Sequence, residues 1–148
     1  MPSYTRSLFH IVFATRYRQP VLDKSNRREF LAYCCTVASR MDCHVYRINC
    51  IEDHLHLLVG LPSTMDLSTF VKRFKLSTGR WLTENPAYPH FERWQEKYGA
   101  FSVSWKDKEV VIEYIKNQEE HHRSESTHDE FVRLLKEYGM EYNPKDEI

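Results

Sequence analysis

The stretch Glu52-Asp53-His54-Leu55-His56-Leu57-Leu58-Val59-Gly60 has the pattern of a short buried strand that ends at a glycine. Side chains alternate between the two faces of a strand, so Leu55, Leu57 and Val59 point to one face and both histidines to the other. Residues two apart on a strand lie roughly 6.5–7 Å apart at Cα, which lets two imidazoles bind one metal ion at about 2.0–2.1 Å each. The spacing predicts a metal site on this strand. The alternative is a half-exposed strand whose outward positions are polar by chance.

A second segment, Val110-Val111-Ile112-Glu113-Tyr114-Ile115-Lys116-Asn117-Gln118-Glu119-Glu120-His121-His122, has apolar residues at helical spacing. Ser104 followed by Asp107 predicts a capped start for this helix. Tyr114 and Gln118 are four residues apart, so they share one helical face. The alternative for Tyr114 is an aromatic residue of the core, and for Gln118 a solvated polar residue.

The remaining pattern predicts the other secondary-structure elements. Strands are expected at residues 8–15, 44–51 and 54–60, and short extended pieces at 91–95 and 100–104. Helices are expected at residues 25–41, 66–83, 106–123 and 129–138, the last closed by Gly139. This order predicts an α+β, ferredoxin-like (βαββαβ) antiparallel sheet with helices on one face, plus a C-terminal helix that carries Tyr114. The histidine strand would then lie in the middle of the sheet.

The composition fits one domain over residues 1–148 that buries a sizeable core. We expect a cytoplasmic protein, because the sequence has no apolar run long enough to span a membrane and no secretion signal at its start. Four cysteines lack the paired spacing of a zinc site, and four glycines form no phosphate-binding loop.

Lys plus Arg and Asp plus Glu both total 21, so the formal net charge is zero, whereas DNA-binding proteins usually have a basic excess. The charges are unevenly distributed, however, and two segments are locally basic. Residues 16–28 hold five basic side chains against one acidic, and residues 69–81 hold four with no acid. The predicted DNA contacts drawn from these segments are Arg16, Arg18, Lys72, Arg73, Lys75 and Arg80. The alternative is that many of them are ordinary solvated side chains.

In their order along the chain, these segments resemble the single-tyrosine HUH transposases, insertion-sequence enzymes that act on single-stranded DNA. The resemblance runs from about Tyr4 to Tyr142. Its motifs are Phe9-His10-Ile11-Val12-Phe13 with the basic-aromatic segment after it, His54-Leu55-His56, Trp94-Gln95-Glu96-Lys97-Tyr98-Gly99-Ala100-Phe101-Ser102-Val103-Ser104, and Tyr114 through His122.

The resemblance implies that Tyr114 is the catalytic nucleophile and that His54, His56 and Gln118 are the metal ligands. Imidazole ligands favour zinc by affinity and oxygen ligands suit Mg²⁺ or Mn²⁺, and the resemblance points to Mg²⁺ or Mn²⁺. The implied product is a 5′-phosphotyrosine ester, whose stored bond energy lets strands be rejoined without a nucleotide cofactor. Reserve candidates near the metal are His121 as a ligand, His10 as a supporting residue, and Glu52 and Asp53 as partners of the imidazoles or simple turn residues.

The resemblance also implies the partners. These are a single-stranded DNA hairpin at the ends of a mobile element, in the nucleoid, and a second copy of the chain. In such a homodimer the tyrosine helix can complete the site of the other subunit. Two alternatives stay open: a domesticated, structure-specific single-strand nuclease with the same chemistry, or a non-catalytic nucleic-acid-binding module.

Overall fold

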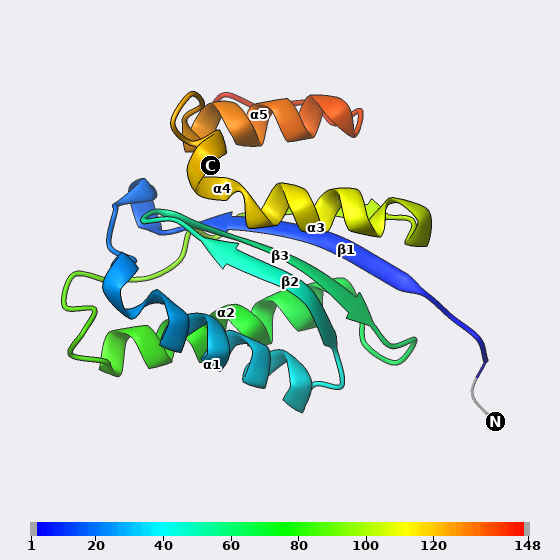
Figure 1. Cartoon of the computed structure of the whole chain (residues 1–148), viewed down its shortest axis with the longest axis horizontal. Coiled ribbons are helices and arrows are strands. Elements are labelled where there is room, and N and C mark those ends of the chain that lie inside the picture. Colours follow the sequence, from blue (N-terminus) through cyan, green and yellow to red (C-terminus); the bar gives the residue numbers. More distant parts are fainter. Residues whose placement is uncertain (1–2, 147–148) are drawn as a thin grey trace.

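A four-stranded antiparallel sheet forms the centre of the structure, a computed structural model that describes residues 3–146 (Figure 1). Its strands are β1 (Ser7–Ala14), β2 (His44–Cys50), β3 (His54–Leu61) and β4 (Gly99–Val103), in the order β2-β3-β1-β4. This is the predicted ferredoxin-like α+β arrangement, and it confirms that the histidine strand β3 lies inside the sheet. The predicted domain covers residues 1–148, of which 1, 2, 147 and 148 lie outside the described part.

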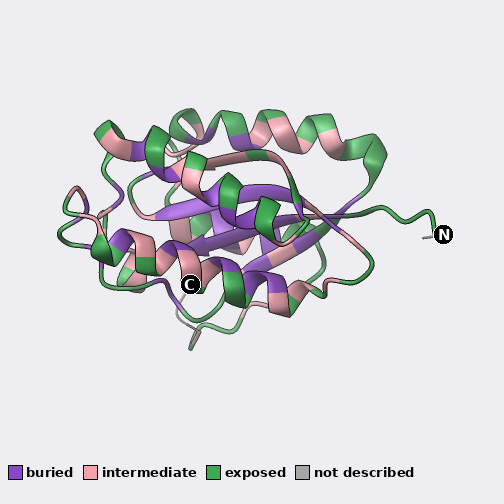
Figure 2. Ribbon diagram, turned by 90° about the horizontal axis from the view of Figure 1, so that it is seen from below, coloured by how far each residue is buried: buried purple, intermediate pink, exposed green. Residues whose placement is uncertain are grey.

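One face of the sheet is covered by α1 (Arg27–Arg40) and α2 (Leu67–Glu84), which lie below the strands in Figure 1. Leu55 and Leu57 of β3 point into this layer and are fully buried with Phe30 of α1 and Phe70 of α2. The strands and the inward sides of both helices form a buried centre (Figure 2), and most of its residues are apolar. The alternation of β3 therefore directs its leucines to the main core and its histidines to the opposite face.

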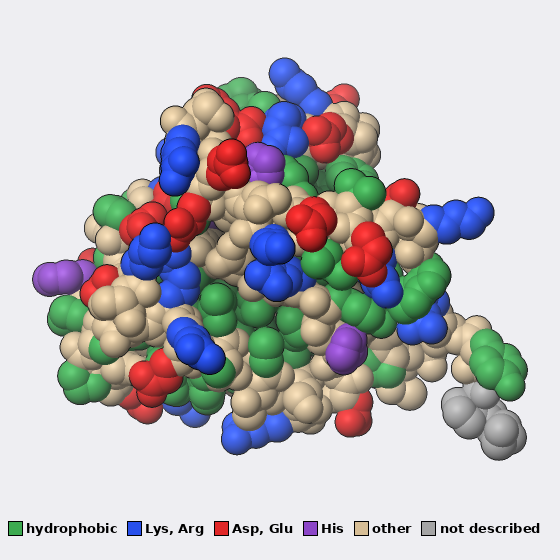
Figure 3. All heavy atoms as spheres, viewed as in Figure 1, with side chains coloured by type: hydrophobic (Ala, Val, Ile, Leu, Met, Phe, Trp, Pro, Cys, Tyr) green, Lys and Arg blue, Asp and Glu red, His purple; other side chains and the backbone are tan. Residues whose placement is uncertain are grey.

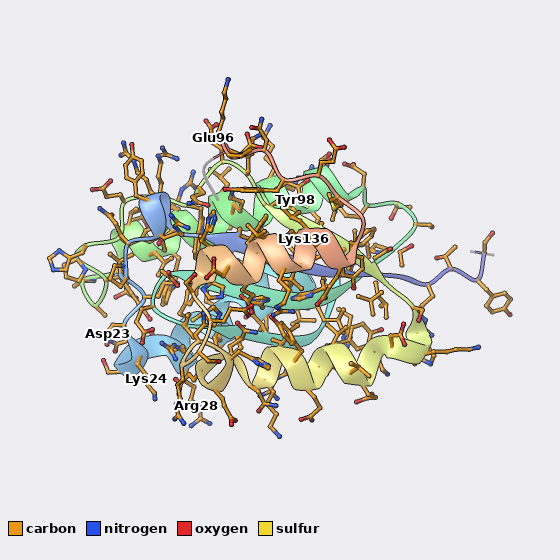
Figure 4. All side chains as sticks on the ribbon, turned by 90° about the horizontal axis from the view of Figure 1, so that it is seen from above. Asp23, Lys24, Arg28, Glu96, Tyr98 and Lys136 are labelled. Carbon is orange, nitrogen blue, oxygen red and sulfur yellow. The ribbon has the colours of Figure 1, made fainter. Side chains whose placement is uncertain are left out.

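The opposite face carries α3 (Lys108–Lys116), α4 (Gln118–His121) and α5 (Thr127–Glu137). Ile115 of α3 packs on Leu58, while Phe131 and Leu134 of α5 pack on Phe101 of β4. Seen from above, α3 and α5 lie side by side over the strands (Figure 4). Helices therefore cover both faces of the sheet, and the C-terminal segment encloses the face that carries the histidines.

The predicted continuous helix over residues 106–123 is interrupted at Asn117. It begins as predicted, because Ser104 Oγ accepts a hydrogen bond from the Asp107 amide. At the break, Asn49 of β2 donates Nδ2 to the carbonyls of Ile115 and Lys116, at 3.0 and 3.3 Å. This side chain provides partners for carbonyls at the end of α3 and fixes where the helix stops.

Other predicted elements differ by small amounts. The helix expected at 25–41 begins with a 3₁₀ turn, η2 (Lys24–Asn26), and further turns lie at η1 (Arg16–Arg18) and η3 (Trp105–Asp107). The extended piece at 91–95 contributes only the antiparallel bridge between Thr15 and Trp94. Gly139 closes α5 as predicted, with a φ of +68° that favours glycine. In the described residues no helix is long and apolar enough to cross a membrane.

Candidate active site

His54 and His56 of β3 form a close pair of imidazoles beneath α3–α5. Their Nε2 atoms lie 3.1 Å apart, and the two residues are 1% and 0% exposed. Strand alternation puts both rings on the same face, as the sequence predicted. The pair is thus sealed from solvent and directed at side chains from the C-terminal helices.

Glu130 of α5 and His122, just after α4, complete a cluster with these two histidines. Glu130 Oε1 lies 2.8 Å from His56 Nε2 and 3.1 Å from both His54 Nε2 and His122 Nε2. One ligand atom from each of the four residues lies within 4.8 Å of every other. Glu130 is only 1% exposed, so its carboxylate is buried among imidazole nitrogens. The sequence interpretation did not include Glu130 or His122 among the candidate ligands.

Gln118, the predicted amide ligand, also reaches this cluster. Its Oε1 lies 3.3 Å from His54 Nε2, while its Nε2 donates to the Tyr114 carbonyl at 3.3 Å. Adjacent donors around one six-coordinate ion at about 2.0–2.1 Å lie about 3 Å apart. The donor pairs described here are separated by 2.8–3.3 Å and combine imidazole nitrogens with amide and carboxylate oxygens. The residues present therefore fit a divalent cation.

The second ring nitrogen, Nδ1, of both His54 and His56 lies within hydrogen-bond distance of another side chain. His56 Nδ1 lies 2.8 Å from Nε2 of His10, the residue expected in a supporting role. His54 Nδ1 lies 2.8 Å from Asp53 Oδ1, and Thr127 Oγ1 donates to the same carboxylate. Such partners set the tautomer and orientation of a ligating histidine. Of the two acidic candidates, Asp53 therefore has this geometry, whereas Glu52 pairs with Arg27 at 3.5 Å.

Tyr114 joins the cluster through Glu130 within a single chain. Its hydroxyl donates to Glu130 Oε2, and the phenolic oxygen of Tyr114 accepts a hydrogen bond from Arg133 Nη2 at 2.6 Å. His121, the reserve ligand, instead stacks on the Tyr114 ring with centroids 4.7 Å apart. The predicted nucleophile and two of the three predicted ligands, His54 and His56, therefore meet around one carboxylate.

Burial and nearby charges shift the pKa values of the residues in this cluster in different directions. Burial alone would lower the pKa of His54, but hydrogen bonds to Asp53 and Glu130 raise it to about 9. Burial lowers the pKa of His56 to about 4. Although burial opposes it, the nearby imidazoles hold the pKa of Glu130 well below its usual range, while burial and the charge of Glu130 raise the pKa of Tyr114. At neutral pH Glu130 is thus ionised and the phenol is protonated.

The six predicted DNA contacts do not gather at this cluster. Arg16 pairs with Glu92 at 3.0 Å, and it lies with Arg18 in η1. The other four, Lys72, Arg73, Lys75 and Arg80, belong to α2 on the opposite side of the sheet. Lys75 donates to the Glu96 carbonyl at 3.1 Å, and burial lowers its pKa to about 8. On the face seen in Figure 3, positive and negative side chains are interspersed. Contact of these residues with DNA stays a prediction.

Comparison with known proteins gives the family context. A sequence model described as "Transposase IS200 like" matches residues 3–118. The transposases for insertion sequence element IS200 of Salmonella typhimurium and Salmonella typhi are each 27% identical over 115 residues, which is 74% of this chain and 75% of theirs.

Two solved structures share the fold. A candidate transposase of Deinococcus radiodurans R1 aligns with a TM-score of 0.63 at 24% identity, covering 80% of this chain and 95% of that one. A REP-associated tyrosine transposase bound to a REP hairpin aligns with a TM-score of 0.59 at 16% identity, covering 82% and 74%. The matched family region ends at Gln118, so His122, Glu130 and Arg133 lie beyond it. From these matches, the chain belongs to the IS200-like transposase family.

Proposed function

We propose that this transposase cuts and rejoins single-stranded DNA through a 5′-phosphotyrosine intermediate on Tyr114. The observation that supports this most directly is the Glu130 carboxylate, which touches the imidazole cluster with one oxygen and the Tyr114 hydroxyl with the other. A phenol and a set of metal-binding donors share one buried centre. That arrangement suits attack of an activated tyrosine on a phosphodiester.

In the proposed cleavage step the Tyr114 oxygen forms a bond to phosphorus while the bond from phosphorus to the 3′ oxygen breaks. The Tyr114 hydroxyl, which Glu130 Oε2 orients by accepting its hydrogen bond, loses its proton to water, and the departing 3′ oxygen takes a proton from water. His54, His56, Gln118 and Glu130 would hold an Mg²⁺ or Mn²⁺ ion, which when bound would supply Lewis-acid polarisation of the scissile phosphate. The hydrogen bond to Glu130 and the stacked His121 ring fix the direction of the phenolic oxygen.

The proposed substrate is a DNA hairpin with single-stranded flanks at the end of a mobile element. One structural relative was solved with a REP hairpin bound, which supports this class of substrate. If the basic residues of η1 and α2 contact its phosphates, affinity should fall steeply as salt is raised. The homodimer expected from the family resemblance also stays a proposal, and sedimentation velocity with and without the oligonucleotide checks it.

A covalent-adduct assay tests this function. The probe is a pool of labelled DNA hairpins with random single-stranded flanks, together with hairpins from the DNA that flanks the gene. With Mn²⁺ present, the wild-type protein should carry label on a denaturing gel. Tyr114→Phe should bind the same hairpins in a mobility-shift assay and form no adduct, since only the attacking oxygen is removed.

The matched control is Tyr4→Phe, which makes the same change at a fully exposed tyrosine. This variant should form as much adduct as the wild type. If the wild type forms no adduct, or if Tyr114→Phe forms as much as the wild type, the proposed function is wrong. Binding of the hairpin without any adduct would favour the non-catalytic module instead.

A further inference from the structure

We propose that Arg133 is a catalytic residue of the rejoining step, where its guanidinium stabilises the Tyr114 oxygen as that oxygen leaves phosphorus. The inference rests on the proposed function and adds a residue from α5, beyond the matched family region. Arg133 Nη2 donates to the Tyr114 oxygen at 2.6 Å, and its guanidinium carbon lies 5.5 Å from the centre of the tyrosine ring. Arg133 thus touches the atom whose bond to phosphorus forms and breaks.

Two carboxylates hold the guanidinium in place. Glu125 accepts from Nε and from Nη2, both at 2.9 Å, and Glu137 accepts from Nη1 at 3.0 Å. The two bonds to Glu125 use the planar fork of the arginine side chain, which restricts its rotation. Exposed ion pairs by themselves contribute little to stability. A purely structural ion pair with Glu125 and Glu137 would not account for the third partner of Arg133, the phenolic oxygen of Tyr114.

The Tyr114 oxygen has two different sides. Glu130, 1% exposed, contacts it from the buried cluster, while Arg133, with a side chain 37% exposed, contacts it from the solvent side. On that side lies a hollow of about 460 Å³ lined by Tyr114, His121, Ser124, Glu125, Asp129 and Arg133. Among these six residues Arg133 is the only arginine or lysine, and Glu125 is already paired with it. A DNA strand entering the hollow would meet the phenol and this cation together.

The chemistry of rejoining calls for a cation at this position. The 3′-hydroxyl of the incoming strand forms a bond to phosphorus and loses its proton to water. The bond from phosphorus to the Tyr114 oxygen breaks, and its electron pair stays on that oxygen. A donor already fixed at an atom where negative charge develops lowers the barrier without reorganising. Glu130, the other group at this oxygen, is negatively charged and cannot serve that purpose.

Single-turnover rejoining isolates this step. Covalent adducts of the wild type and of Arg133→Gln are purified and mixed with a strand bearing a 3′-hydroxyl, and the joined product is followed. We expect Arg133→Gln to rejoin about 10- to 100-fold more slowly, the range that loss of one charged hydrogen bond gives. Lys136→Gln, the same change of charge at an exposed residue of α5 (Figure 4), should stay within about two-fold of the wild type.

A substituted tyrosine distinguishes catalysis from structural support. With 3,5-difluorotyrosine at position 114 the phenol is a better leaving group, so less stabilisation is needed. This substitution should speed rejoining by Arg133→Gln much more than rejoining by the wild type. Glu125→Gln, which loosens the guanidinium without removing it, should slow rejoining several-fold and be rescued in the same way. It serves as the second variant if Arg133→Gln does not fold.

Two results would overturn the assignment. Equal rejoining by Arg133→Gln and the wild type would exclude a role for Arg133. A slow variant that difluorotyrosine fails to rescue, with a lowered melting temperature, would identify a structural ion pair. If the wild type forms no adduct, the proposed function fails and this inference fails with it. If it does form an adduct, either of the first two results removes only the role of Arg133.

Discussion

Tyr114 and Glu130 share a hydrogen bond that joins the tyrosine helix to the imidazole cluster. The hydroxyl donates to Glu130 Oε2, and Oε1 of the same carboxylate lies 2.8 Å from His56 Nε2. The two residues are sixteen apart in sequence and come from separate helices. Helix α5 therefore contributes directly to the site, although it lies beyond the region by which the family is recognised.

Replacing Glu130 with Gln should weaken cation binding while preserving the shape of the site. The amide keeps an oxygen near His56 but removes the negative charge, so we expect the dissociation constant for Mn²⁺ to rise by at least about ten-fold. Isothermal titration calorimetry measures this without any DNA. Glu120→Gln, at an exposed residue of α4, is the control and should leave the constant unchanged. An unaltered constant in Glu130→Gln would place this carboxylate outside the ligand set.

Divalent cations should stabilise the folded protein through His54 and His56. Ligand that binds only the native state at about 100 times its dissociation constant adds about 2.7 kcal/mol, which raises the melting temperature by several degrees. EDTA should reverse the shift. His56→Gln should abolish it, whereas His90→Gln, at an exposed histidine, should retain it. A shift of equal size in both variants would contradict a cation site on β3.

The sequence predicted the parts of the site that depend on local pattern. Period-two alternation directed His54 and His56 to one face of β3, and the i, i+4 spacing put Tyr114 and Gln118 on one helical face. The order of strands and helices predicted the sheet topology, and with it the central position of β3. All of these follow from residues that are near one another in sequence or from a known arrangement of elements.

The missing part depends on how α5 packs. Phe131 and Leu134 dock on Phe101, and this tertiary contact carries Glu130 to the imidazoles. One signal was present: Glu130 and Leu134 are four apart, so a charged residue lies on an apolar stripe. The sequence did not predict the break in the helix at Asn117 for a similar reason, because the residue that terminates α3, Asn49, comes from a strand distant in sequence. Pattern within a segment cannot reveal a partner from elsewhere in the chain.

Without metal, stability should be greatest near pH 6.5. The pKa of His54 is raised from its ordinary 6.5 to about 9, so its contribution is complete below pH 6.5 and lost as pH rises through 9. The pKa of His56 is lowered from 6.5 to about 4, so its contribution is present above pH 6.5 and lost as pH falls towards 4. Glu130, whose pKa is lowered from 4.5, adds to the loss in acid.

Urea midpoints measured from pH 4 to 9 in EDTA check this dependence. His54→Asn should flatten the decline on the alkaline side, because the residue with the raised pKa is gone. His90→Asn, which replaces an exposed histidine, should leave the shape of the profile unchanged. A wild-type midpoint that kept rising from pH 6.5 to 9 would contradict the raised pKa of His54.

Removing the Asn49 side chain should disturb the position of Tyr114 and leave cation binding nearly unchanged. In Asn49→Ala the carbonyls of Ile115 and Lys116 lose their donor, which should cost about 1 kcal/mol of unfolding free energy. Tyr114 lies in the last turns of α3, so its oxygen should become less well ordered and adduct formation should slow. The Mn²⁺ dissociation constant should change little, because Asn49 pairs with His56 through the backbone of the sheet, which the substitution keeps, while its side chain hydrogen-bonds to the backbone of Ile115, Lys116 and Cys50. Thr36→Ala, which removes an exposed hydrogen bond within α1, is the control for stability alone.

Parallel loss of adduct and of cation affinity in Asn49→Ala would mean that the end of α3 supports the whole cluster and not Tyr114 in particular.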